Sequence, residues 1–117
     1  FVDENGVSHK LHMKGEKYVK KDAAKVKKAV VEFLKKLRKC NKDAYILWCF
    51  GILGDGLKPF ITEAIEEYKE LTKDKKVGFL ELPNTTEETV GARNHPGKAA
   101  HEKAAKVIVR KLKNVLK

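Results

Sequence analysis

Residues 44–50, Ala-Tyr-Ile-Leu-Trp-Cys-Phe, form an apolar run that does not alternate with polar residues. A strand with this pattern has no polar face, so it must be covered on both sides, as parallel strands are in α/β folds. The Asn-Lys-Asp sequence at 41–43 is a turn signal before the run, and a glycine-containing loop at 51–56 follows it. We therefore predict a buried strand over residues 44–50, with Trp48 and Cys49 in the core.

A helix and a second strand are predicted downstream of this run. Residues 57–71 carry apolar side chains at helical spacing, and Pro59 suits the first turn of a helix. Residues 77–82, Val-Gly-Phe-Leu-Glu-Leu, then form a strand that ends at Pro83. Strand, helix and strand in this length make a βαβ unit with a parallel, right-handed connection. The apolar positions of this helix are Leu57, Phe60, Ile61, Ala64, Ile65, Tyr68 and Leu71.

Two further helices flank the unit and place the chain in the α/β class. The first is predicted over residues 22–39, with Asp22 as its N-cap. The second runs from Lys98 to about residue 116. Residues 1–21 are polar and contain a turn signal, so we predict a long loop there. The apolar stripe of the first helix is Ala23, Val26, Val30, Phe33, Leu34 and Leu37.

His95 is the candidate functional residue. It stands between Asn94 and Pro96, and the Pro-Gly pair that follows it cannot lie inside a helix, so His95 is on a loop directly before the last helix. The loop at 84–96 follows the second strand, and in a parallel sheet it emerges at the same edge as the loop at 51–56. Asp55 in the latter loop is either a helix cap or a carboxylate of the site.

The residues around His95 also resemble a known family. The run Gly91-Ala92-Arg93-Asn94-His95-Pro96, followed by Ala-His-Glu-Lys-Ala-Ala at 100–105, resembles the last conserved block of SGNH (GDSL-type) hydrolases. It is most similar to the block of the acetylesterases in carbohydrate esterase family 2. Residues 43–51 resemble a strand of the same enzymes. The resemblance covers about the last two thirds of the chain and implies a three-layer, flavodoxin-like parallel sheet of about five strands. This chain would supply its last two strands and the flanking helices.

The same resemblance implies a function. The chain would be part of a serine esterase that removes acetyl or other acyl groups from carbohydrate, with His95 as the general base and no cofactor or metal ion. Imidazole suits this task because its pKa lies near neutral pH. An extracellular or cell-surface location is implied for the full-length protein, and His101 matches a recurring family position that we interpret as structural.

The chain departs from the family pattern in two respects. The Gly-Asp-Ser block that carries the nucleophile and the two blocks that supply oxyanion donors are absent, and the only serine, Ser8, lacks a glycine elbow. Arg93 stands where many members have an Asp, and a guanidinium cannot accept a hydrogen bond from the imidazole. We therefore interpret residues 1–117 as a single partial domain in which residues 22–117 form the αβαβα C-terminal part. By itself it should be inactive, because it lacks the nucleophile and the oxyanion donors. Two parallel strands also leave an unpaired edge, so we expect an N-terminal portion or a second copy to complete the sheet.

The charge distribution supports an alternative. The formal net charge of +10 is unevenly distributed: residues 10–40 carry 12 Lys/Arg against 3 Asp/Glu, and residues 96–117 carry 7 against 1. The alternative is a non-catalytic hydrolase remnant, or a basic binding module for an acidic partner. No aromatic residues interleave with the lysines and no nucleic-acid motif is present, so nucleic acid is not the expected partner.

The remaining residues with possible chemistry predict no further site. Cys40 and Cys49 match neither a disulfide scaffold nor a metal motif, so we expect free thiols. His9 and His12 are three residues apart but lack further ligands, which favours a solvated pair over a metal site. No apolar run is long enough for a membrane span, and no signal peptide is visible.

Overall fold

The computed structural model describes residue 2 and residues 4–117. Its elements are a short hairpin, three α-helices, a pair of longer strands and one 3-10 turn. In chain order they are β1 (Met13–Lys14), β2 (Lys17–Tyr18), α1 (Lys20–Cys40), β3 (Ile46–Gly51), α2 (Lys58–Thr72), β4 (Val77–Leu82), η1 (Ala92–Asn94) and α3 (Lys98–Val115).

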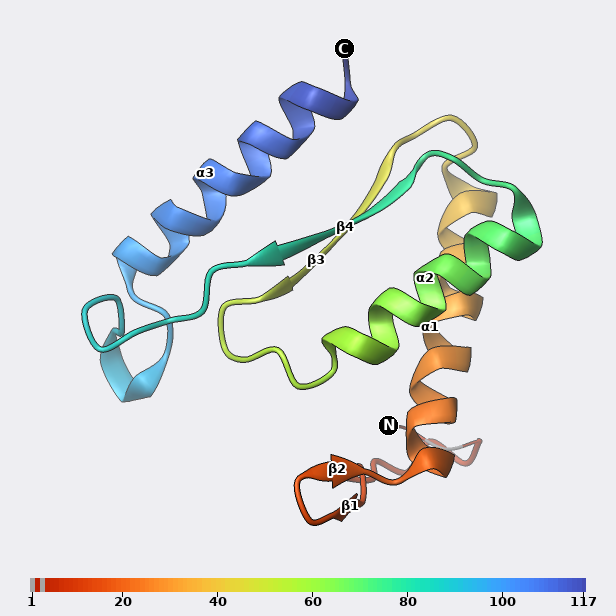
Figure 1. The fold of residues 1–117 in the computed structure, drawn as a ribbon, viewed down its shortest axis with the longest axis horizontal. Coiled ribbons are helices and arrows are strands. Elements are labelled where there is room, and N and C mark those ends of the chain that lie inside the picture. Colours follow the sequence, from red (N-terminus) through yellow and green to blue (C-terminus); the bar gives the residue numbers. More distant parts are fainter. Residues whose placement is uncertain (1, 3) are drawn as a thin grey trace.

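The β3–β4 pair is the parallel pair that the sequence predicts. Its register runs from Ile46 opposite Val77 to Gly51 opposite Leu82. Figure 1 shows β3 and β4 between two groups of helices, with α3 on one side and the α1–α2 pair on the other. The α/β class is therefore confirmed, and the arrangement is compatible with part of a flavodoxin-like fold.

The core lies between α1, α2 and one face of the strand pair. Leu34 of α1 and Ala64, Ile65 and Tyr68 of α2 are at most 1% exposed. Since successive strand residues point to opposite faces, Ile46, Trp48 and Phe50 of β3 reach this core together. Further members are Val30, Val31, Ile61, Val77 and Phe79.

The second face of the pair is less well covered than the apolar run predicts. All six residues of β3 are only half-buried, so a strand closed on both sides is not what the described residues form. On that face α3 contacts β4, and Ala100 and Ala104 are the only two buried residues of this helix. Each strand also keeps one edge with no neighbouring strand among the described residues, and such an edge is a site for further pairing.

Several local predictions are corrected. The segment predicted as a loop at 1–21 contains the β1–β2 hairpin, and α1 begins at Lys20. The N-cap of α1 is Val19, without a side-chain bond, whereas Asp22 is buried in the first turn. There Asp22 Oδ2 accepts hydrogen bonds from the backbone nitrogen of His12 at 2.7 Å and from its ring Nδ1 at 2.8 Å. His12 is therefore not merely solvated: it ties the hairpin segment to α1.

The predicted apolar stripes of the helices have the right spacing, but not every residue on them is buried. Phe33 is 50% exposed and Leu71 is 63% exposed, although both lie on predicted apolar stripes. Phe33 instead meets the Trp48 ring edge-on, with 5.9 Å between centroids. No helix among the described residues is long and apolar enough to cross a membrane.

Candidate functional site

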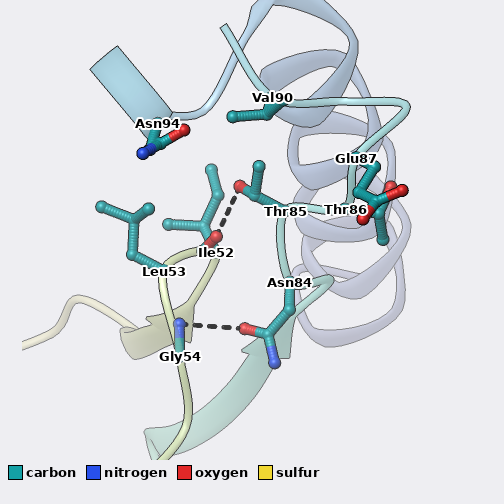
Figure 2. A pocket seen from close by; sticks show the side chains of 9 residues that line it. All are labelled: Ile52, Leu53, Gly54, Asn84, Thr85, Thr86, Glu87, Val90 and Asn94. Carbon is teal, nitrogen blue, oxygen red and sulfur yellow. Dashed lines mark hydrogen bonds between the residues drawn. The ribbon is translucent and has the colours of Figure 1, made fainter.

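Two loops meet at the carboxyl ends of β3 and β4, as the parallel topology predicts. The Thr85 backbone nitrogen donates to the Ile52 carbonyl oxygen at 2.9 Å, and Thr85 Oγ1 donates to the same oxygen at 2.6 Å. Asn84 Oδ1 accepts from the Gly54 backbone nitrogen at 3.2 Å. Figure 2 shows the two bonds that involve the side chains of Thr85 and Asn84, which cross the space between the loops. The loop after β3 and the loop after β4 therefore form one joint rim.

An open pocket of about 450 Å³ lies at this rim. That volume is within the range of small-molecule sites, about 300–1,000 Å³. The pocket combines apolar side chains with amide and hydroxyl groups and one carboxylate, that of Glu87, and this mixture is typical of small-molecule sites. Its lining is Ile52, Leu53, Gly54, Asn84, Thr85, Thr86, Glu87, Val90 and Asn94.

The backbone around the pocket is strained at three non-glycine positions. Ile52 has a φ of 67°, and the successive residues Arg93 and Asn94 have φ values of 55° and 60°. A positive φ is rare outside glycine, above all for a β-branched residue such as Ile52. Such conformations cost about 1–3 kcal/mol each and cluster at functional sites. The strained residues therefore lie at the same rim, at the carboxyl ends of β3 and β4, where the parallel topology predicts a ligand site.

His95 lies on a backbone that is fixed on both sides. Its nitrogen donates to the Ala92 carbonyl at 3.1 Å, its own carbonyl accepts from Gly91 at 2.7 Å, and a β-bridge joins Val90 to Pro96. The helix α3 begins three residues later, at Lys98. The prediction that His95 sits on a loop just ahead of the last helix is confirmed.

The His95 ring itself is exposed and has no hydrogen-bond partner among the described residues. It is not one of the lining residues, although the adjacent Asn94 is. Figure 2 shows the Asn94 side chain above the pocket, beside the ends of Ile52 and Leu53. The structure therefore positions the histidine loop at the rim, and the imidazole meets neither an acceptor nor a nucleophile within the part of the chain described.

The hydroxyl groups of this chain are engaged or distant. Ser8 is exposed and pairs with Val2 in an isolated bridge. The segment that carries it lies near the start of α1, away from the loop that carries η1 (Figure 1). Thr86 Oγ1 and Thr89 Oγ1 hydrogen-bond each other at 3.2 Å, and Thr85 Oγ1 is bound to Ile52. None of these hydroxyls is arranged as a nucleophile next to His95.

The other candidates take simpler roles. Asp55 makes no side-chain cap for α2, and only its carbonyl oxygen accepts from Lys58, at 2.8 Å. His101 is exposed on α3, and the structural role interpreted for it stays a prediction. Cys40 and Cys49 are free thiols, as predicted, and burial raises the pKa of the half-buried Cys49. No cluster of metal-ligating side chains occurs among the residues described.

Sequence reasoning missed most of the pocket lining. It selected the two loops and His95, but not Ile52, Asn84 or Asn94 as members of one site. The position of Asn84 directly after a strand and Pro83 was the available signal, because side chains at such positions face the functional edge of a parallel sheet. The strain at Ile52 had no sequence signal, since isoleucine is disfavoured at a positive φ.

Comparison with solved structures gives one consistent group. An acetyl xylan esterase from the rumen bacterium Butyrivibrio proteoclasticus matches with a TM-score of 0.89 and 41% identity over 99% of this chain. A family two carbohydrate esterase from Clostridium thermocellum, in complex with cellohexaose, matches with a TM-score of 0.73 and 29% identity over 80% of this chain. The chain covers only 32% and 30% of these two structures. No protein-family model and no curated protein sequence matches it.

Proposed function

This chain is similar in sequence and fold to part of the family 2 carbohydrate esterases, and on that ground we propose that it is part of an enzyme that removes acetyl groups from carbohydrate. The similarity to the acetyl xylan esterase over 99% of the chain carries the proposal. In this proposal, residues 22–117 are the αβαβα C-terminal part of an SGNH hydrolase domain. The rim between the loops after β3 and β4 is its active-site edge.

His95 is the proposed general base. It takes the proton of a serine hydroxyl as that oxygen attacks the ester carbonyl, and it returns the proton to the leaving sugar hydroxyl. The serine and the oxyanion donors come from another part of the protein, since Ser8 lies elsewhere in the fold and the threonine hydroxyls at the rim are engaged. The backbone hydrogen bonds within residues 91–97 support this proposal, because they hold the backbone of His95 on the loop beside the pocket.

The test uses the full-length protein and compares two histidines in the same segment. His95→Ala should reduce the rate of acetate release from acetylated xylan and from an aryl acetate by about 10²–10⁴-fold, the contribution of a general base. His101→Ala is the matched control, because His101 is also exposed and lies six residues away on α3. Equal activity of the His95→Ala variant and the wild type would contradict the proposal.

The open strand edges support a proposed partner. β3 and β4 each leave one edge unpaired among the described residues, and β3 is only half-buried. We propose that the remaining portion of the protein, or a second copy, adds strands there. Light scattering of the isolated chain should then show association, whereas a monodisperse species of 13.3 kDa with cooperative unfolding would argue against it.

A second candidate function rests on Arg93. By the resemblance to SGNH hydrolases, it occupies the position where many members carry an Asp that orients the histidine, and a guanidinium has no acceptor to offer. A hydrolase remnant that only binds would show no ester hydrolysis before or after the His95→Ala substitution. The same activity measurement in the full-length protein therefore separates the two functions.

A further inference from the structure

A second pocket lies at the opposite end of the strand pair, where the chain enters β3 and β4. Its volume is about 590 Å³. It is formed by the C-terminal ends of α1 and α2 and by the residues that lead into the two strands, so it is remote from the His95 rim (Figure 1). The lining residues are Lys35, Arg38, Lys42, Tyr68, Thr72, Lys73, Asp74, Lys75 and Lys76.

The lining is strongly basic and its one acid is already neutralised. Six of the nine lining residues are Lys or Arg, and the only carboxylate is that of Asp74. Asp74 is bound by Arg38 Nε at 2.7 Å and by the Tyr68 hydroxyl at 2.9 Å. Arg38 in turn donates to the carbonyl oxygens of Asn41, Lys42, Ala44 and Lys76. The donors of Arg38 are therefore occupied by acceptors of the protein itself, and the lysines supply the positive charge that faces solvent.

Four of these lysines have no acidic partner among the described residues: Lys42, Lys73, Lys75 and Lys76. The Lys76 ammonium donates only to the backbone carbonyl oxygen of Asp43, at 3.3 Å. Elsewhere in the chain lysines do pair, as Lys27 does with Glu63 at 3.1 Å. Cations near a helix C-terminus can be explained by the helix dipole, but that effect falls off beyond the last turn. Lys42 and Lys75 lie beyond the last turns of α1 and α2, so the dipole does not account for them.

A cleft lined by one sign of charge attracts ligands of the opposite sign. No exposed aromatic ring lines this pocket, because Tyr68 is 1% exposed. It therefore lacks a stacking surface for nucleic-acid bases. Binding must come from charge, so the ligand has to carry its own negative groups.

We propose that this lysine pocket, defined by Lys42, Lys73, Lys75 and Lys76, binds carboxylate-bearing sugar residues of an acidic polysaccharide. That the ligand is a polysaccharide rests on the proposed function. That the ligand is negatively charged rests only on the lysines that line the pocket. Because the pocket and the His95 rim lie at opposite ends of the strands, only a polymer would engage both. The pocket would then retain acidic polymers without touching the scissile ester.

The test is equilibrium binding of the chain to polygalacturonate by isothermal titration calorimetry, with hydroxyethyl cellulose as the neutral polymer. The triple variant Lys42→Gln, Lys73→Gln and Lys75→Gln should bind about tenfold more weakly, since each exposed charge pair adds a small increment. The matched control is Lys14→Gln, Lys17→Gln and Lys21→Gln, which removes the same charge from exposed residues of β1, β2 and α1. It should bind like the wild type.

Three outcomes would overturn the proposal: no binding of polygalacturonate by the wild type, equal loss in both triple variants, or equally tight binding of polyglutamate and duplex DNA. Equal unfolding temperatures of the two variants show that the fold is intact. The result is separable from the proposed function, because His95→Ala should reduce hydrolysis by the full-length protein about 10²–10⁴-fold and leave polygalacturonate binding unchanged.

Discussion

Arg38 Nε donates a hydrogen bond of 2.7 Å to Oδ2 of Asp74, which joins the end of α1 to the segment that enters β4. The two side chains are 19% and 12% exposed. Tyr68 donates to the same carboxylate oxygen, and Asp74 Oδ1 accepts from the Lys76 backbone nitrogen at 2.9 Å. One carboxylate thus connects both helices of the core to the second strand.

Replacing this carboxylate should destabilise the chain. Asp74→Asn keeps the shape but leaves the partly buried Arg38 charge without its counterion, which should lower the free energy of unfolding by about 2–4 kcal/mol. Tyr68→Phe removes one hydrogen bond and should cost about 1 kcal/mol. Urea unfolding measures both values. Equal stability of the Asp74→Asn variant and the wild type would show that the ion pair contributes nothing.

The same carboxylate should make stability depend on pH. Burial is the largest single influence and by itself would raise the pKa of Asp74, but the hydrogen bonds from Arg38, the Lys76 backbone and Tyr68 together with the Arg38 charge outweigh it, so the pKa lies below its usual value. A carboxyl whose pKa is lower in the folded state contributes stability above its unfolded pKa of about 4 and loses it as the pH falls through the folded value. The difference in stability between wild type and Asp74→Asn should therefore shrink below about pH 4.

A core leucine and an exposed leucine test the packing of the two helices. Leu34 is 0% exposed between α1 and α2, whereas Leu71 is 63% exposed. Leu34→Ala removes a buried side chain and leaves a cavity, which should cost about 2–5 kcal/mol. Leu71→Ala should change the free energy of unfolding by no more than about 0.5 kcal/mol. Thermal unfolding of both variants gives the comparison, and similar losses would mean that Leu71 is covered in solution.

These two leucines also show what the sequence can predict. Helical spacing placed both on an apolar stripe, but spacing does not say where along the helix a neighbour covers the stripe. The parallel pairing of residues 46–51 with 77–82 was predictable, because a short βαβ unit has few alternatives. The Asp22–His12 contact was not, since it depends on a hairpin whose strands are two residues long.

At the candidate site, too, one part was predictable from the sequence and another part was not. The loop position of His95 followed from Pro96 and Gly97, because proline restricts the residue before it. The pocket beside it depends on the approach of Thr85 to Ile52, which are 33 residues apart, and on a backbone conformation that isoleucine disfavours. A local pattern carries no information on such a contact, so only the fold reveals it.

The two thiols should differ in reactivity. Cys40 is exposed at the end of α1, whereas Cys49 is half-buried in β3, where burial raises its pKa. The thiolate is the reactive form, so a raised pKa reduces its fraction at mildly alkaline pH. With a disulfide reagent the chain should show one fast and one slow phase. The fast phase should disappear in Cys40→Ser, and two equal rates would contradict the half-buried position of Cys49.

Alanine substitutions at two glycines of the rim distinguish the cost of a steric clash from the cost of an unfavourable backbone conformation. Gly51 and Gly54 have φ values of 131° and 124°, so an alanine is strained at either position. A Cβ on Gly51 would lie 2.4 Å from the Leu82 carbonyl oxygen of β4, whereas a Cβ on Gly54 meets nothing within 4 Å. Gly54→Ala should therefore cost about 1–3 kcal/mol from conformation alone. Gly51→Ala should cost about 1–3 kcal/mol more, because β3 and β4 must separate where the pocket begins.

Urea unfolding measures the loss of stability in each variant. Hydrogen exchange of the Thr85 amide, which donates to the Ile52 carbonyl oxygen, should accelerate more in Gly51→Ala than in Gly54→Ala. Equal losses in the two variants would mean that the ends of β3 and β4 are not in contact in solution.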